Sequence, residues 1–263
     1  MDKKIAIVTG GSSGIGLWAA HYLAEDKYTV YELSRRENDN IEIKHLKCDV
    51  TDEKQVKIAI EYVIKEERKI DLVINCAGFG ISGAVEFSKA DDIKRQFDVN
   101  FFGMDNVNRS VIPYLRQSKG RIINISSVAA VASIPFQTYY SSCKAAINSY
   151  TLALANELRP FGISVCAIMP GDTHTGFTKA REKCIDGDDL YQGRITRSVE
   201  RMEKDELGGV DAKIVGKYIY EIATRKMVKP LYTVGIQYKI IVFLLKILPY
   251  RLSNYLIYRI YGQ

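Results

Sequence analysis

The chain has 263 residues, of which 47% are hydrophobic and 26% are charged, and its formal net charge is +6. This composition is typical of a globular protein, so we expect one domain over residues 1–263. Five cysteines without a Cys-x-x-Cys pair argue against a disulfide framework and a cysteine-based zinc site, and they fit a reducing cytoplasm. The longest apolar run, residues 240–248, contains Lys246 and is far shorter than the roughly 20 residues that cross a bilayer.

Short runs rich in Val and Ile alternate with longer segments of helical periodicity. We expect strands at residues 4–9, 28–33, 70–75, 121–126 and 163–170, and helices at 14–25, 53–66, 90–116 and 139–158. This alternation predicts parallel β-α-β units, with helices covering both faces of the sheet. Residues 172–210 are rich in charge and glycine and lack strand signals, which is typical of a mobile lid.

A glycine-rich loop follows the first predicted strand and leads into a helix. Gly10 is expected to make the tight turn, Gly14 to let backbone N–H groups approach a pyrophosphate, and Gly16 to allow close packing of helix on strand. The helix N-terminus would face the anion, because its first N–H groups have no partner within the helix. The loop therefore predicts a nucleotide site that includes Thr9, Gly10, Ser12, Ser13, Gly14, Ile15 and Gly16.

The end of the second predicted strand bears on the choice of cofactor. An acidic residue about 20 positions beyond the glycine loop would bind the ribose hydroxyls of NAD. Ser34 stands at that distance here, and Arg35 and Arg36 follow it. A guanidinium suits the additional 2'-phosphate of NADP, so we favour NADP(H) over NAD(H). Two alternatives remain open, namely that the arginines are solvated loop charges and that Glu32 is the ribose ligand.

Three shorter motifs follow in chain order. Cys48, Asp49 and Val50 precede the second helix, while Pro170 and Gly171 end the last strand. The third strand ends in Asn75, Cys76, Ala77 and Gly78. With the glycine loop, these motifs make the chain resemble the short-chain dehydrogenase/reductase family over residues 3 to about 225.

The resemblance implies a Rossmann-like, doubly wound α/β fold with a mostly parallel sheet. It implies that Asp49 bonds the adenine ring, that Val50 packs against that ring, and that the segment after Pro170 lies beside the nicotinamide. Cys76 departs from the family pattern, which has Asn at this position. The implied cofactor contacts beyond the glycine loop are Ser34, Arg35, Arg36, Asp49, Val50, Asn75, Ala77, Gly78, Tyr140, Lys144, Pro170, Gly171, Thr173 and Thr175.

Tyr140 and Lys144 form the expected chemical core. They lie four residues apart and therefore share one face of a helix. Free tyrosine, with a pKa of about 10, is a poor acid or base at neutral pH unless a neighbouring cation such as Lys144 favours the phenolate. Ser127 and Asn100 precede Tyr140 by 13 and 40 positions, and both offsets match the family's catalytic tetrad.

The resemblance also implies a reaction, namely hydride transfer between a nicotinamide ring and a carbonyl or alcohol carbon. Tyr140 would donate or accept the proton on oxygen, and Ser127 would hold that oxygen. Lys144 would lower the pKa of Tyr140 and bind the nicotinamide ribose, with Asn100 supporting it through a water. We weigh this oxidoreductase reading against a noncatalytic NADP(H)-binding sensor and a membrane-associated interaction protein, neither of which needs the tetrad.

The expected pocket walls are mostly apolar and predict a hydrophobic carbonyl substrate such as a steroid or another lipid. These walls are Phe79, Ile81, residues 128–136 and the lid after Gly171. The alternative is an acidic substrate that meets cations of the lid, namely Lys179, Arg181 and Lys183.

The three histidines lack metal-ligand spacing, so no metal is expected.

Residues 222–263 contain seven basic residues, six of the 17 tyrosines and no acidic residue. The segment from about 231 to 263 is both apolar and basic. It predicts either two amphipathic helices, separated at Pro249, that close the pocket or form a subunit interface, or peripheral attachment to a membrane. Binding to nucleic acid is not expected. The family resemblance suggests a dimer or tetramer built around Phe101 and Tyr150.

Overall fold

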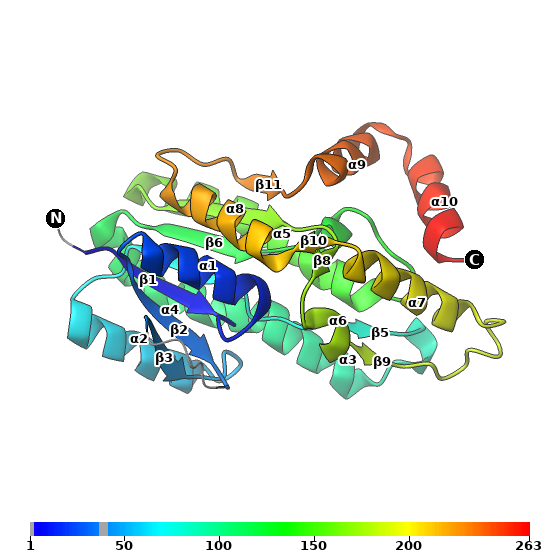
Figure 1. Cartoon of the computed structure of the whole chain (residues 1–263), viewed down its shortest axis with the longest axis horizontal. Helices are drawn as coiled ribbons and strands as arrows, with labels where there is room; N and C mark the ends of the chain where they lie inside the picture. The colour runs from blue at the N-terminus through cyan, green and yellow to red at the C-terminus, as the bar shows by residue number, and fades with distance from the viewer. Residues whose placement is uncertain (1–2, 37–41) are drawn as a thin grey trace.

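A seven-stranded sheet forms the centre of the protein in the computed structural model, which describes residues 3–36 and 42–263 (Figure 1). The strand order is β3-β2-β1-β4-β6-β7-β11, and every neighbouring pair is parallel. This sheet confirms the predicted doubly wound α/β fold. Its strands are β1 (Ile5–Thr9), β2 (Thr29–Ser34), β3 (Ile43–Lys47), β4 (Leu72–Asn75), β6 (Arg121–Ile125), β7 (Ser164–Met169) and β11 (Leu231–Thr233).

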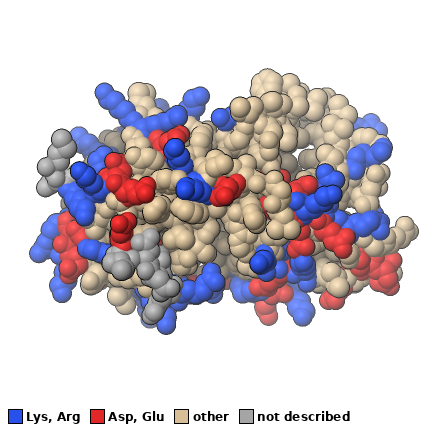
Figure 2. Space-filling view, in the orientation of Figure 1, with Lys and Arg blue, Asp and Glu red and all other residues tan. Residues whose placement is uncertain are grey.

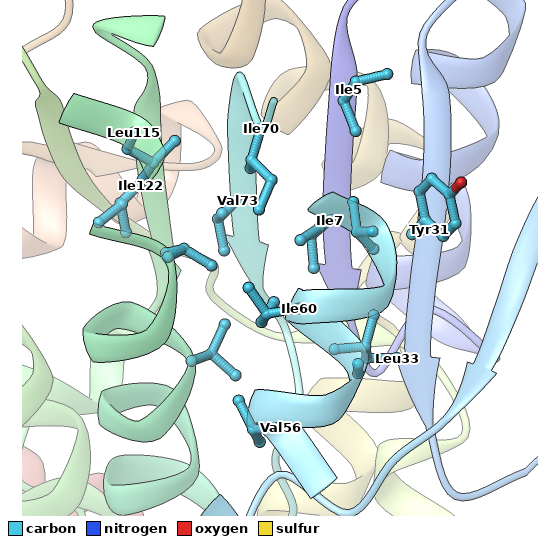
Figure 3. Packing of buried hydrophobic residues seen from close by; sticks show 14 of the residues in the cluster. Ile5, Ile7, Tyr31, Leu33, Val56, Ile60, Ile70, Val73, Leu115 and Ile122 are labelled. Carbon is cyan, nitrogen blue, oxygen red and sulfur yellow. The ribbon is translucent and has the colours of Figure 1, made fainter. Parts of the chain in front are cut away.

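Helices cover both faces of this sheet. Helices α1 (Gly14–Glu25) and α8 (Ala212–Thr224) pack on one face, and α2 (Glu53–Glu67), α4 (Gly103–Ser118) and α5 (Thr138–Leu158) pack on the other. Successive side chains of a strand point to opposite faces, so Ile7 contributes to the second of these layers and Val8 to the first. Figure 3 shows Ile7 among the buried side chains beneath α2.

The predicted helix over residues 90–116 is interrupted. It consists of α3 (Ala90–Phe97), a π-helical segment η2 (Asp98–Phe102) and α4. Strands β3 and β11 were not predicted, because β3 is a half-exposed edge strand and β11 has only three residues. Short elements complete this region, namely β5 (Ile81–Ser82), η1 (Val85–Phe87), η3 (Val128–Ala130) and η4 (Arg159–Phe161).

The segment predicted as a lid contains defined elements, and its motion stays a prediction. These elements are β8 (Thr173–His174), α6 (Phe177–Ala180), β9 (Glu182–Lys183) and α7 (Arg194–Leu207), with β10 (Val210–Asp211) at its end. The short strands contradict the expected lack of strand structure there. Their two-residue pairings leave no periodic pattern in the sequence.

The C-terminal segment forms α9 (Ile236–Ile247) and α10 (Tyr250–Tyr261), which Pro249 separates. Figure 1 shows both helices at the end of the molecule away from the N-terminus, raised above the sheet layers. No helix in the described ranges is long and apolar enough to cross a membrane.

Candidate active site

One large cavity of about 810 Å³ lies at the carboxyl ends of the central strands. Loops that follow β1, β2, β4, β6 and β7 meet there because parallel strands end at the same edge of a sheet. The strand order reverses between β1 and β4, and ligands of open α/β sheets bind at such a switch point. Side chains from α9 and α10 line the other end of the cavity.

The glycine loop forms a cradle at one end of the cavity. Gly10 and Gly14 have φ angles of +64° and +58°, a region that favours glycine. A Cβ on Gly16 would lie 2.5 Å from the Gly10 carbonyl oxygen, so only glycine fits between the loop and α1. Helix α1 begins without a capping side chain or an acidic residue in its first turn. The loop and the helix N-terminus therefore suit a phosphate-bearing cofactor.

Most of the predicted cofactor residues line this cavity. Contact with a cofactor stays a prediction for each of them. The residues brought together are Gly10, Ser12, Ser13, Gly14, Ile15, Gly16, Ser34, Arg35, Arg36, Asp49, Val50, Ala77, Gly78, Tyr140, Lys144, Pro170, Gly171, Thr173 and Thr175.

Thr9 and Asn75 are the predicted cofactor residues that do not line the cavity. The Thr9 hydroxyl accepts hydrogen bonds from the backbone N–H groups of Cys76 and Ala77, at 3.1 and 3.2 Å. The Asn75 amide donates to Asn108 and Asn124, at 2.8 and 2.9 Å, within the interior. Both side chains hold strand ends and helices in place, and their contact with a cofactor stays a prediction.

The arginine pair and Glu32 point in different directions. Arg35 and Arg36 are exposed and line the cavity beyond β2. Glu32 is fully buried under Gly11, and its carboxylate hydrogen-bonds His45. Glu32 does not line the cavity, so the geometry gives no support to the alternative in which it binds the ribose, and the choice of ribose ligand stays a prediction.

Tyr140, Lys144 and Ser127 meet at the middle of the cavity. Tyr140 and Lys144 lie one turn apart near the start of α5, and Ser127 follows β6. The Ser127 hydroxyl oxygen accepts a hydrogen bond from the Ala129 N–H at 3.1 Å, and the same side chain lies near enough to Tyr140 to lower the pKa of its hydroxyl. The Lys144 Nζ donates to the Ile125 carbonyl oxygen at 2.9 Å and lies 5.6 Å from the centre of the Tyr140 ring. The Phe177 ring, 5.7 Å away, covers Tyr140 from the lid side.

Burial has the largest effect on the pKa values of both groups of this core. It raises the pKa of Tyr140, and the Ser127 side chain opposes that rise without reversing it. Burial also lowers the pKa of Lys144. The raised pKa keeps the phenol of Tyr140 protonated at neutral pH. The expectation that Lys144 lowers the pKa of Tyr140 stays a prediction.

Asn100 lies in the π-helical segment η2, which sequence periodicity did not predict. Its side-chain oxygen accepts from the Phe79 N–H at 2.9 Å, and its amide donates to the Phe79 carbonyl at 2.8 Å. A Cβ on Gly78 would lie 3.0 Å from the Asn100 oxygen and 3.9 Å from the Lys144 Nζ, so these two side chains flank Gly78. Asn100 thus positions the loop after β4, and its predicted link to Lys144 through a water stays a prediction.

The far end of the cavity contains residues that the sequence did not reveal. Asp172 is half-buried there and accepts a hydrogen bond from the Tyr238 hydroxyl at 2.8 Å. Burial raises the pKa of Asp172. Both groups line the cavity with Glu206 and with apolar side chains of α9 and α10. Only proximity to Pro170 and Gly171 could have suggested Asp172, and no local signal identifies Glu206 or Tyr238.

The predicted walls and lid cations have mixed outcomes. Phe79 and several residues between 128 and 134 line the cavity, whereas Ile81 and Phe136 do not. The lid cations do not reach the cavity either. Arg181 is paired with Glu206, and Lys183 is 2.6 Å from Glu203. The alternative of an acidic substrate bound by these cations is therefore not supported.

Comparisons with known proteins agree with this geometry. A family model described as short chain dehydrogenase matches residues 4–185. The 3-ketodihydrosphingosine reductase of Bacteroides thetaiotaomicron is 40% identical over 230 residues, covering 86% of both chains. A short chain dehydrogenase/reductase of Burkholderia phymatum, solved with NAD, has a TM-score of 0.81 at 23% identity over 92% of each chain. ElxO with NADP bound has a TM-score of 0.74 at 25% identity, covering 91% of this chain and 99% of that one.

Proposed function

The chain belongs to the short-chain dehydrogenase/reductase family of oxidoreductases, and from this premise we propose that it is an NADP(H)-dependent reductase of a hydrophobic, long-chain ketone. One observation carries the proposal. Tyr140, Ser127 and Lys144 line the same cavity as the glycine loop and as apolar side chains of α9 and α10. A cofactor and an apolar substrate can therefore meet at the same tyrosine.

The nicotinamide cofactor supplies the hydride when it is bound. Tyr140 donates a proton to the carbonyl oxygen, since its raised pKa keeps the phenol protonated at neutral pH. Ser127 holds the same oxygen by hydrogen bonding and stabilises the negative charge that develops on it. Lys144 orients the cofactor ribose from the same helix face. The cavity walls exclude water from these groups.

Our preference for NADP(H) rests on the exposed arginines at the end of β2. Arg35 and Arg36 line the cavity, and neither forms an ion pair with another described residue. Among the described residues of β2, Glu32 does not line the cavity, and one of its carboxylate oxygens contacts His45.

Replacement of Arg35 by alanine tests this preference. A charged hydrogen bond contributes about 1.5–3 kcal/mol, so we expect the Kd for NADPH to rise by roughly 10- to 150-fold. The Kd for NADH, which lacks the 2'-phosphate, should change little and is the internal control. Titration of cofactor fluorescence measures both. Equal weakening of the two cofactors would remove Arg35 as a phosphate ligand.

The apolar end of the cavity supports a substrate with a long aliphatic part. Leu245, Leu248 and Ile257 line this end, and Asp172 and Glu206 are the acidic groups beside them. The relative at 40% identity is named for 3-ketodihydrosphingosine, a long-chain amino ketone. We extend that substrate class to this chain. A steroid ketone is the competing substrate.

We also propose a cytoplasmic homo-oligomer, a dimer or tetramer, that touches a membrane surface through its C-terminal helices. The proposed subunit contact lies around Phe101 and Tyr150, whose rings pack edge to face at 5.7 Å. The adjacent Phe102 is half exposed and available for such a contact. Light scattering of the purified protein tests the oligomeric state.

A substrate panel with both cofactors is the decisive experiment. We expect oxidation of NADPH in the presence of 3-ketodihydrosphingosine or another long-chain ketone, and slower turnover with steroid ketones, quinones and sugars. Faster turnover of a steroid ketone would show that steroids, and not long-chain ketones, are the preferred substrate class. Absence of turnover with every carbonyl compound, in a protein that binds NADPH, would favour a noncatalytic sensor instead.

A further inference from the structure

Helix α9 presents a stripe of apolar side chains to the outside of the molecule. Ile236, Ile240, Phe243 and Ile247 recur at helical spacing, with exposed fractions of 54% to 77%. Single exposed apolar residues are ordinary, but a continuous row on one helix face marks an interaction surface. Figure 2 shows that uncharged side chains dominate the surface over α9. We call these four residues the outer stripe.

The inner sides of α9 and α10 form the mouth of the cavity. Ile241, Leu244, Leu256 and Ile260 line the cavity, yet their exposed fractions are 41% to 54%. Side chains that face both the cavity and the surface leave only a thin wall between them. Figure 2 shows the molecule hollowed beneath α9. The cavity therefore opens between α10 and α9, the helix that carries the outer stripe.

All the charged side chains on α9 and α10 themselves are positive. Lys239, Lys246, Arg251 and Arg259 are exposed on α9 and α10, and no acidic residue follows Glu221 in the sequence. None of the four forms an ion pair within the described ranges. A second copy of this chain packed stripe to stripe would bring these cations together. Anionic lipid headgroups would instead be complementary to them.

We infer that α9 and α10 lie on an anionic lipid surface and that the cavity opens directly into the lipid. The outer stripe enters the boundary between headgroups and acyl chains, while the lysines and arginines meet the headgroups. Tyr250 and Tyr255, both exposed, lie on α10 at the same end, where tyrosine favours the interface. A long-chain ketone then reaches Tyr140 without crossing water. The passage of substrate rests on the proposed function, whereas docking does not.

Flotation of the full-length chain with vesicles tests the docking. We expect binding to phosphatidylcholine vesicles that contain phosphatidylglycerol, weaker binding to phosphatidylcholine alone, and release by high salt. Each lysine near such a surface contributes on the order of fivefold, so Lys239→Gln with Lys246→Gln should weaken binding about 30-fold. Protein that stays unbound with anionic vesicles at low salt would overturn the inference.

A paired variant separates the outer stripe from general hydrophobicity. Phe243→Ser with Ile247→Ser should lower vesicle binding by about tenfold or more, since several methylene groups leave the lipid. The matched control, Ile58→Ser with Ile214→Ser, removes equally exposed apolar side chains from α2 and α8 and should bind as the parent does. Equal binding by both variants contradicts the inference. The parent protein could also be a dimer that does not bind vesicles, while the stripe variant is a monomer and the control variant stays a dimer. That result would show that a second copy of the chain covers the outer stripe.

Activity measurements keep the two proposals apart. The stripe variant should reduce a short, water-soluble ketone at the parent's rate, because neither residue lines the cavity. It should reduce a long-chain ketone embedded in anionic vesicles about tenfold more slowly than the control variant does. Loss of turnover with both ketones in the parent protein overturns the proposed function, while flotation still reports docking.

Discussion

The two ends of the cavity are built in different ways. At the glycine loop, backbone atoms approach so closely that a Cβ on Gly10 would lie 2.9 Å from the backbone of Ala77. At the C-terminal helices, the walls are long apolar side chains, many of them half exposed. The first end accepts no added atoms, whereas the second can change its side chains without altering the fold. If the glycine loop binds the proposed cofactor, its fit depends mainly on backbone geometry, whereas the fit of a substrate at the other end would depend on side chains.

Replacement of Tyr140 by phenylalanine should have the largest effect, because the two ends meet at this hydroxyl. Loss of a general acid costs about 10²- to 10⁴-fold in turnover. NADPH binding and the melting temperature should stay near those of the parent. Tyr139→Phe is the matched control, since the Tyr139 hydroxyl makes only a 3.5 Å contact with the Val85 carbonyl. Steady-state kinetics on both variants measure the difference, and a Tyr140→Phe enzyme with normal turnover would contradict the assigned role.

Gly16→Ala probes the end of the cavity at the glycine loop. Its Cβ would lie 2.5 Å from the Gly10 carbonyl oxygen, so we expect a loss of about 1–3 kcal/mol in the free energy of unfolding. The displaced loop should also bind NADPH more weakly. Gly176→Ala is the control, because no heavy atom lies within 4 Å of its added Cβ. Urea unfolding of both proteins tests the contrast, which disappears if the two substitutions cost the same.

Leu245→Ser probes the end of the cavity at α9 and α10. Leu245 lines the cavity from α9, and a hydrophobic pocket discriminates by about 1–3 kcal/mol per missing group. We expect kcat/KM for a long-chain ketone to fall by roughly 5- to 150-fold on that basis. The Kd for NADPH and the rate with a short ketone should not change. Equal losses with short and long ketones would mean that the aliphatic chain does not reach α9.

Asp172→Asn should have the smallest effect, which is a change in how the free energy of unfolding depends on pH. Burial raises the folded-state pKa of Asp172 above the ordinary value of 3.8. Its favourable contribution to the free energy of unfolding is therefore fully present when the pH is below the ordinary pKa. This contribution is lost as the pH rises through the folded-state pKa. Asparagine keeps an acceptor for the Tyr238 hydroxyl without this loss. Thermal melts from acidic to neutral pH should show the variant gaining stability relative to the parent as pH increases, and a constant difference would contradict the raised pKa.

The sequence by itself determined the parallel α/β fold and most of the residues that line the glycine-loop end of the cavity. These features depend on local spacing, which a sequence displays directly. Glycines after a strand, tyrosine and lysine one helical turn apart, and alternating Val/Ile runs are all short-range patterns. The same local view could not show that Thr9 and Asn75 turn inward, because that follows from neighbours about 70 and 30 to 50 residues away.

Only the tertiary structure decided which residues line the end of the cavity at α9 and α10. Asp172 meets Tyr238 across 66 residues, and Arg181 meets Glu206 across 25 residues. The π-helical segment that holds Asn100 and the orientation of α9 and α10 are likewise set by packing against distant elements. Apolar residues in the C-terminal segment predict helices, but their order along the chain does not say which side chains face a cavity and which face outward. That division depends on where the remainder of the chain lies, since burial is a property of the folded surface as a whole.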